Sequence, residues 1–296
     1  MMPPVSRLSP EEIVEEICAV TGKPRAEVAA RVEAERQSCG ANVCDDARRL
    51  GVTWHVFDAA MERLYRETDG FVFETMVFWS SGSRPEWIAR AEERLALRCR
   101  ADGLAREDAR VLVWGDGTGS DSIALAGAGF RPDVLEYPGS RTFEFLSRRL
   151  ERHGLLGDRV RVITDASALS EASYDAVVCF EVLEHVPEPV RMIERLAGLL
   201  RPGGVALVTE AFREVSAGLP THLRSNLRYA GRTPFLFRDA GLHLTWFAAR
   251  PRFKPSEYRK LTRPGLREHL ALYHPRVLKH WLTARRFRSQ SSAARP

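Results

Sequence analysis

The stretch Val111-Leu-Val-Trp-Gly-Asp-Gly-Thr-Gly119 limits the possible folds of this chain more than any other. A short apolar run ends at Trp114, glycines stand at 115, 117 and 119, and a helical pattern over 120–128 follows at once. This order predicts a strand, a tight turn and a helix. Glycine suits a turn that approaches a ligand, and the free N–H groups of the next helix face that ligand. We therefore expect a cofactor-binding turn at the carboxyl end of the first strand of an α/β sheet.

Strand-like and helix-like segments alternate from Asp108 to Glu210. Parallel strands need helical crossovers, so the alternation predicts a Rossmann-like parallel sheet with helices on both faces. An irregular basic region follows. Residues 242–249 then alternate or run apolar, and we expect them to form a late antiparallel strand.

Residues 1–104 lack strand alternation and carry helical signals. Ser9-Pro-Glu-Glu12 is a capping box with proline at the first helical position. The aromatic segment 68–82 is expected to form a lid or a pocket wall. The sequence thus predicts three units, which are a helical N-terminal cap that covers the substrate (1–104), a sheet domain with a substrate insert after its fifth strand (105–284) and a basic disordered tail (285–296).

Composition excludes several classes of protein. Hydrophobic residues at 44% and charged residues at 28% are ordinary for a globular chain. No apolar run is long enough to span a membrane, and the first residues lack the apolar core of a secretion signal, so we expect a cytoplasmic protein. The five cysteines form no CxxC pair, and histidines are not grouped near them, so we expect neither a metal site nor a disulfide framework.

Charge is distributed unevenly along the chain. Residues 201–296 hold 16 Arg and 3 Lys against 5 Asp or Glu, an excess of +14, whereas the chain as a whole carries +5. Such a section could bind an anionic substrate, a carrier protein or nucleic acid, or it could be a solvated surface.

The glycine turn resembles the first motif of the class I S-adenosylmethionine-dependent methyltransferases. The dinucleotide fingerprint fits less well, because it requires a third glycine where Ser120 stands. Segments 134–136, 160–166, 174–186 and 200–210 resemble later motifs of the same family in the same order, so the resemblance covers roughly residues 105–250. It implies S-adenosylmethionine as cofactor and methyl transfer by in-line displacement. Val113 departs from the family pattern, which has an acidic residue there that contacts the methionine part of the cofactor.

The resemblance also implies which residues bind the cofactor. Glu136, about twenty residues after the glycines, is expected to accept hydrogen bonds from the ribose hydroxyls, and Asp165 to lie near the adenine. Asp116 could partly replace the acid missing at Val113, and Tyr137 could line the adenine pocket. The full expected set is Gly115, Asp116, Gly117, Thr118, Gly119, Glu136, Tyr137, Asp165, Ala166 and Glu181.

Glu181, Glu184 and His185 follow the fourth strand, where family members place groups that face the substrate. These three are the expected catalytic residues. An imidazole titrates near pH 6.5 and can take a proton at neutral pH. His185 could equally be a structural residue of the common Leu-Glu-His-Val pattern. His222 and three arginines of the insert, at 224, 228 and 232, are weaker substrate-binding candidates.

We expect a small-molecule acceptor, anionic or aromatic, and a role in natural product biosynthesis; a homodimer is left open. The residues after Phe180 lack the Asn/Asp-Pro-Pro-aromatic motif of many nitrogen methyltransferases, which disfavours a planar nitrogen acceptor. Three alternatives remain. The first is a nucleic-acid or protein methyltransferase, which would use the basic section to bind its substrate. The second is a non-catalytic binding domain, which Val113 would suit. The third, an NAD-dependent oxidoreductase, is disfavoured by Ser120.

Overall fold

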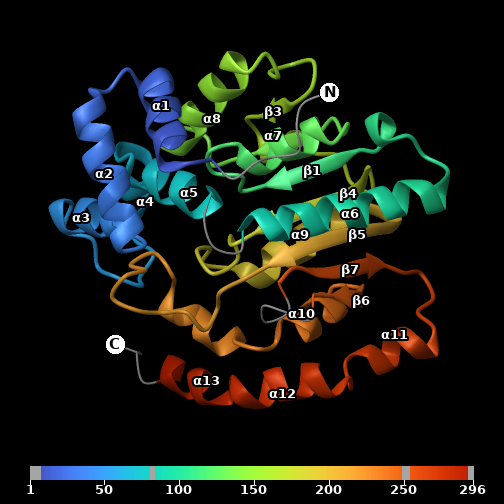
Figure 1. Ribbon diagram of the computed structural model, residues 1–296. Coiled ribbons are helices and arrows are strands. Elements are labelled where there is room, and N and C mark those ends of the chain that lie inside the picture. Colours follow the sequence, from blue (N-terminus) through green and yellow to red (C-terminus); the bar gives the residue numbers. More distant parts are fainter. Residues whose placement is uncertain (1–7, 81–83, 249–253, 293–296) are drawn as a thin grey trace.

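A seven-stranded sheet forms the centre of the molecule, with strand order β3-β2-β1-β4-β5-β7-β6 (Figure 1). The computed structural model describes residues 8–80, 84–248 and 254–292. The first five strands pair in parallel, as the alternation predicts, and the order reverses between β1 and β4. A ligand site is expected at such a reversal. The strands are β1 (Val111–Trp114), β2 (Asp133–Leu135), β3 (Arg161–Ile163), β4 (Tyr174–Phe180), β5 (Leu200–Thr209), β6 (Leu242–Phe247) and β7 (Ser256–Lys260).

Residues 242–247 form the predicted late strand as β6, which pairs antiparallel with β7; residue 249 lies outside the described part of the chain. β7 runs antiparallel between β5 and β6, whereas β6 lies at the edge and runs in the direction of β5. The sequence of β7, Ser-Glu-Tyr-Arg-Lys, does not predict a strand inside the sheet, because a charged residue in it is buried. Glu257 is fully buried and accepts hydrogen bonds from Arg94 and Arg98.

Successive strand residues point to opposite faces of the sheet, and a separate hydrophobic core lies on each face. Val111, Val113 and Val178 pack against α6 (Arg84–Asp102), α7 (Ser120–Gly127) and α8 (Arg141–Arg152). On the other face, Leu112, Val177 and Val208 pack against α9 (Pro189–Leu199) and α10 (Thr233–Asp239). Helices therefore cover both faces, as predicted. Short 3-10 helices are η1 (Arg106–Asp108), η2 (Ala166–Ala168) and η3 (Arg224–Tyr229).

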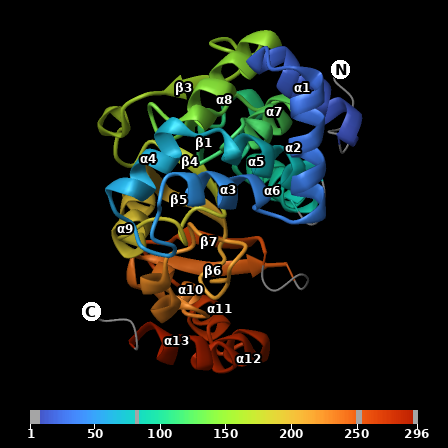
Figure 2. The same cartoon turned by 90° about the vertical axis from the view of Figure 1, so that its left-hand side faces the viewer.

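The N-terminal helices gather at one end of the molecule (Figures 1 and 2). The aromatic segment expected as a lid or pocket wall is helix α5, which contacts α1, α2, α3, α6 and α8. It is apolar on almost every side, as expected for a helix buried among others. The remaining helices are α1 (Pro10–Thr21), α2 (Arg25–Gln37), α3 (Ala41–Arg49), α4 (Ala59–Glu67) and α5 (Gly70–Ser80).

Helix α6 joins the cap to the sheet. Its residues Trp87, Ile88 and Leu95 lie in the same core as Val111 and Phe180. The expected division between residues 104 and 105 therefore cuts through one packed core.

The C-terminal segment is helical where the sequence predicts a disordered tail from residue 285. Helix α13 extends to Ser292, and residues 293–296 lie outside the described part of the chain. Arg288 donates a hydrogen bond to the Ala230 carbonyl (2.8 Å), and Phe287 packs on the second core. These contacts anchor the segment despite its polar composition. The three helices are α11 (Leu266–Ala271), α12 (Pro275–Thr283) and α13 (Arg285–Ser292). No helix of the described residues is long and apolar enough to cross a membrane.

Candidate active site

The glycine turn lies between β1 and α7, and each of its three glycines has a positive φ. The values are 76° at Gly115, 66° at Gly117 and 83° at Gly119, which L-residues with side chains rarely adopt. A Cβ at Gly115 would collide with the Val182 side chain, and one at Gly117 would lie 3.1 Å from Thr75 Cγ2 of α5. The turn is thus closed in by the segment after β4 and by the cap.

Glu136 directly follows β2 and contacts the glycine turn. Its Oε2 accepts the Gly117 N–H at 2.5 Å and its Oε1 accepts the Tyr137 N–H at 2.9 Å. Burial raises the pKa of this carboxyl group. Each oxygen keeps a further lone pair, so the carboxylate can still accept hydrogen bonds from a ligand.

Tyr137 points toward the cap. Its hydroxyl donates to Glu62 Oε1 at 2.8 Å and accepts from Arg66 Nη2 at 2.8 Å, both on α4. The side chain is exposed, which excludes the alternative that it belongs to the core.

Asp116 caps helix α7. It is buried, and its two oxygens accept the N–H groups of Asp121 and Ser122, each at 2.9 Å. Burial and the neighbouring Asp121 raise its pKa to about 7. Asp116 therefore holds the start of the helix, and its role as the substitute for the acid missing at Val113 stays a prediction. Val113 itself is buried in the core under α6.

Asp165 caps the short helix η2 after β3, with Ala166 as the first residue of that helix. Its carboxylate accepts the Ser167 N–H at 2.8 Å and the Ser167 hydroxyl at 2.6 Å, and these bonds lower its pKa. It stands at the same carboxyl edge of the sheet as Glu136. Thr118, in the glycine turn, is buried, and its carbonyl accepts a hydrogen bond from Arg149 at 3.1 Å.

Glu181 is the first residue after β4 and has a positive φ of 54°. Its N–H donates to Thr209 Oγ1 at 3.0 Å, and Lys254 Nζ lies 2.8 Å from its Oε1 and 2.9 Å from its Oε2. Left-handed backbone at a residue other than glycine is strained and is concentrated at functional sites. The strain and the ion pair both fix this carboxylate at the edge of the sheet.

Glu184 is fully buried, and neither of its carboxyl oxygens has a hydrogen-bond partner among the described residues. Burial and the nearby Glu181 charge raise its pKa well above the usual value. The direction follows from the burial, because a buried carboxylate without partners is costly.

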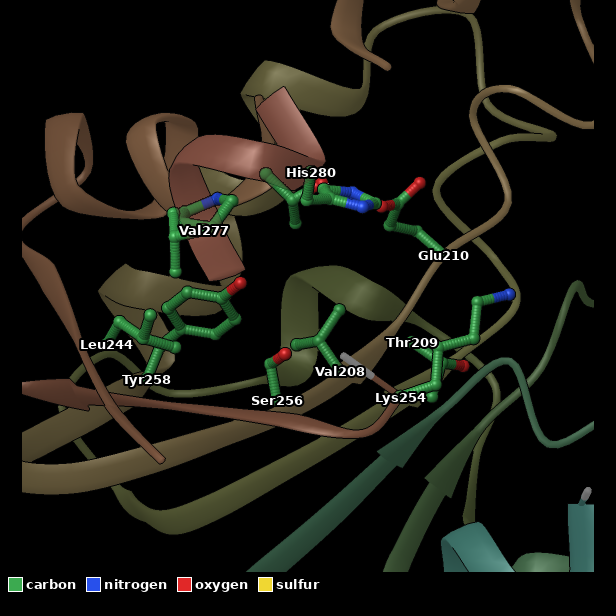
Figure 3. A pocket seen from close by; sticks show the side chains of 11 residues that line it. Val208, Thr209, Glu210, Leu244, Lys254, Ser256, Tyr258, Val277 and His280 are labelled. Carbon is green, nitrogen blue, oxygen red and sulfur yellow. The ribbon is translucent and has the colours of Figure 1, made fainter. Parts of the chain in front are cut away.

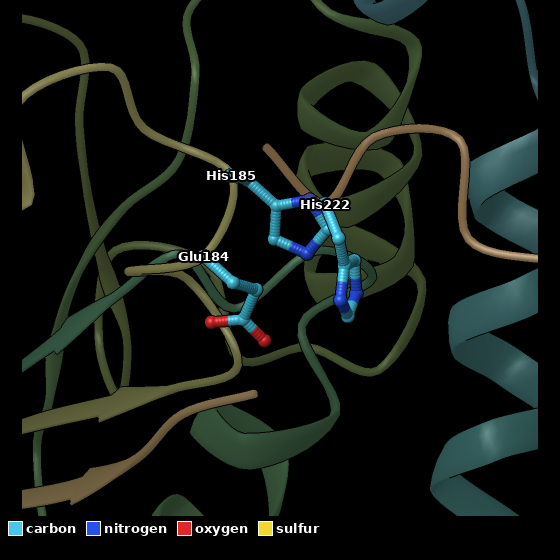
Figure 4. A group of neighbouring side chains, drawn as sticks. All are labelled: Glu184, His185 and His222. Carbon is cyan, nitrogen blue, oxygen red and sulfur yellow. The ribbon is translucent and has the colours of Figure 1, made fainter. Parts of the chain in front are cut away.

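His185 contacts one residue of the N-terminal cap, Tyr65, and one residue of the insert after β5, His222. Its Nδ1 lies 3.3 Å from the Tyr65 hydroxyl of α4, and its ring packs edge-on against His222, with centroids 4.7 Å apart (Figure 4). Burial lowers the pKa of His185 to about 4 and that of His222 well below its usual value, so both imidazoles are neutral at pH 7.

Ligand atoms of Glu184, His185 and His222 all lie within 4.8 Å of one another. Two imidazoles and a carboxyl group at this spacing could hold a cation such as Zn²⁺, although the sequence predicts no metal.

A small pocket lies beside Lys254, at the carboxyl end of β5 (Figure 3). Glu210 on its wall accepts hydrogen bonds from Thr233 Oγ1 (2.9 Å) and the Phe212 N–H (2.7 Å). The other wall is formed by Val277 and His280 of α12.

Comparison with known proteins identifies the family of this chain. A family model described as a methyltransferase domain matches residues 84–291. The chain belongs to this methyltransferase family. The match confirms the predicted family, and with it the enzyme class and S-adenosylmethionine as cofactor.

Two curated relatives that share one name show how far the sequence similarity extends. The "Ubiquinone biosynthesis O-methyltransferase" of Xanthomonas campestris pv. campestris (strain B100) is 32% identical over 139 residues, which cover 47% of this chain and 58% of that protein. The protein of the same name from Xylella fastidiosa (strain 9a5c) is 35% identical over 156 residues, or 51% and 61% of the two chains. The chain thus spans about three fifths of the length of these curated relatives.

Solved structures are more distant. A SAM-dependent methyltransferase from Aquifex aeolicus is 14% identical, with a TM-score of 0.46 over 61% of this chain and 94% of that chain. The 1,6-didemethyltoxoflavin-N1-methyltransferase of Burkholderia thailandensis is 22% identical, with a TM-score of 0.40 over 60% and 82%.

Sequence reasoning missed several residues of this methyltransferase site. Lys254 is one of only four lysines in an arginine-rich chain, and that rarity was the available signal. Arg84 and Asp121 form a buried ion pair (2.6 Å) behind the glycine turn, and Trp79 Nε1 donates to the same Asp121. No local motif indicates that pair. His222 joins the site, whereas the insert arginines at 224, 228 and 232 are exposed.

Proposed function

We propose that this methyltransferase moves the methyl group of S-adenosylmethionine to a hydroxyl oxygen of a small acceptor. The acceptor binds where α4, the insert and the carboxyl end of β4 meet. The observation that carries the proposal is the neutral His185 imidazole at this junction, held between Tyr65 and His222. The imidazole offers a lone pair in the segment that follows β4.

The residues present fit the cofactor. The glycine turn has three residues at positive φ, and Glu136 at its rim keeps lone pairs for hydroxyl groups. Backbone of the turn, Glu136 and the segment from Asp165 would hold it. When bound, S-adenosylmethionine supplies an electrophilic methyl group and a thioether leaving group.

His185 would accept the proton of the hydroxyl group. Its Nδ1 shares a hydrogen bond of 3.3 Å with the Tyr65 hydroxyl, and the ring nitrogen that carries no hydrogen would take this proton. A pKa of about 4 makes the imidazole a weak base, so an acidic hydroxyl such as a phenol suits it best. The Glu181 charge raises the pKa of His185 and so stabilises the imidazolium that forms.

The relatives support an oxygen acceptor, since their printed name is that of an O-methyltransferase. We further propose that the acceptor is a small aromatic compound of specialised metabolism. The competing class is a nucleic-acid or protein substrate, for which only the basic C-terminal section argues.

Transfer of radioactive methyl from S-adenosylmethionine tests the proposal. We expect incorporation into phenols and catechols of an acceptor panel, and none into RNA, DNA or histones. His185→Gln should lower kcat at least about 100-fold while S-adenosylhomocysteine affinity stays unchanged. Label in nucleic acid or protein alone, or full activity of His185→Gln, would overturn the proposal.

A further inference from the structure

The C-terminal helices expose large apolar side chains to solvent. Leu266 is 74% exposed, Leu270 53%, Tyr273 69% and Leu282 57%. These values exceed those of every other large hydrophobic residue in the described part of the chain. Exposed apolar side chains gathered in one segment mark an interaction surface, whereas scattered ones do not.

Leu266, Leu270 and Tyr273 recur at helical spacing, so they form one apolar stripe along α11 and the turn after it. The stripe forms one wall of a groove, and Leu244, Trp246 and Phe247 of the edge strand β6 form the other wall. Figures 1 and 2 place α11, α12 and α13 at the opposite end of the molecule from α1 and α2. The surface is therefore distinct from the cap and its contacts.

Cationic side chains alternate with this apolar stripe. Arg263, Arg267, Arg276 and Lys279 are all exposed. Glu268 is the only acidic residue among the last 36, and its carboxylate is bound to the Gly265 N–H at 2.9 Å. The surface thus combines exposed leucines, an aromatic residue and a strong positive charge.

We propose that α11 and α12 dock this protein on an anionic lipid bilayer. Leucines and Tyr273 would enter the boundary between headgroups and acyl chains, and the arginines and Lys279 would lie on lipid phosphates. A nucleic acid would meet the cations but leave the leucines in water. A second copy of the chain would bring the same positive charge against itself. An anionic bilayer satisfies both features at once.

This docking does not depend on methyl transfer. The pocket of Figure 3 lies between α12 and Lys254, so the docked helix also forms one wall of the pocket beside the active site. A lipophilic acceptor in the bilayer would be close to that wall.

Sedimentation with vesicles tests the proposal. The full chain should bind vesicles that contain about one third phosphatidylglycerol at least tenfold more tightly than vesicles of pure phosphatidylcholine, and high salt should abolish the difference. The double variant Leu266→Asn/Leu270→Asn should bind the anionic vesicles at least fivefold more weakly. Arg267→Gln/Lys279→Gln should lose about tenfold.

Matched controls separate docking from general effects. Leu97→Asn/Leu156→Asn changes two exposed leucines elsewhere, and Arg131→Gln removes an exposed arginine outside the surface. Both should bind vesicles like the natural chain. Unchanged S-adenosylhomocysteine binding in every variant would show that the cofactor site is intact. The proposal fails if anionic vesicles are not bound, if the controls lose as much as the test variants, or if a DNA oligonucleotide competes fully for the surface.

Discussion

Lys254 Nζ lies within 2.9 Å of both carboxylate oxygens of Glu181, although 73 residues separate the two in sequence. The pair joins the end of β4 to the segment that enters β7, and the ammonium group also stands over the Trp87 ring, 5.1 Å from its centroid. Both side chains are largely buried. The pair therefore fixes one carboxylate at the site, and its charge helps to raise the pKa of the neighbouring Glu184.

Removing the ammonium group should destabilise the fold. We expect Lys254→Met to lower the free energy of unfolding by about 3 kcal/mol, because it leaves the Glu181 charge buried without a cation. Urea denaturation at pH 7 measures this loss. The double variant Glu181→Gln/Lys254→Met should recover most of the stability, and a double variant as unstable as the single one would refute the role of the pair.

Gly117 and Gly154 provide a matched comparison, because their φ values are 66° and 64°. A Cβ at Gly154 meets nothing within 4 Å, whereas one at Gly117 meets Thr75. Both alanine variants should lose about 1–2 kcal/mol through left-handed strain. Calorimetry should find weaker S-adenosylhomocysteine binding only in Gly117→Ala.

Thr75→Ser removes the methyl group that the new Cβ would approach. In the Gly117→Ala background this change should restore part of the lost stability. Equal losses of affinity in Gly117→Ala and Gly154→Ala would disprove the role of the glycine turn.

Glu136→Ala should weaken S-adenosylhomocysteine binding by about 1.5–3 kcal/mol. The carboxylate accepts the Gly117 N–H and so fixes the turn, and it would also bind the ribose hydroxyls. Isothermal calorimetry measures the change. Glu144→Ala removes an exposed carboxylate of α8 and should have no effect. An unchanged affinity in Glu136→Ala would assign the ribose to another residue.

Stability should depend on pH through His185, measured with a chelator present. Its folded pKa of about 4 lies below the usual 6.5, so the unfolded state binds a proton first as pH falls. The stability that His185 contributes is complete above about pH 6.5 and is lost toward pH 4, by about 2 kcal/mol between pH 7 and 5. His185→Gln should flatten the pH dependence by this amount. Identical slopes in the natural chain and in His185→Gln would contradict the burial of His185.

The sequence predicts those parts of the fold in which periodicity follows burial. The strands from Val111 to Thr209 are apolar, and glycine marks the turn between β1 and α7, so their order and the cofactor turn could be read directly. Helix α5 has no polar face, so no amphipathic pattern indicates it. β7 cannot be predicted for a different reason. Its Glu257 is charged yet buried, because Arg94 and Arg98 of α6 bind it.

The candidate site divides in the same way. Glu136 and His185 follow strands and were predicted with them, whereas the sequence does not indicate that Asp116 caps α7. Lys254, Tyr65 and His222 reach the site from distant segments. Contacts of that kind depend on the tertiary fold, and a single sequence carries no local sign of them.

Calorimetric titration of the purified chain with S-adenosylmethionine and S-adenosylhomocysteine, with NAD as control, tests the central claim most directly. We expect both sulfur ligands to bind with micromolar affinity and NAD not to bind. Absence of binding by either sulfur ligand would mean that the departure at Val113 prevents cofactor binding, and it would contradict the proposed methyl transfer.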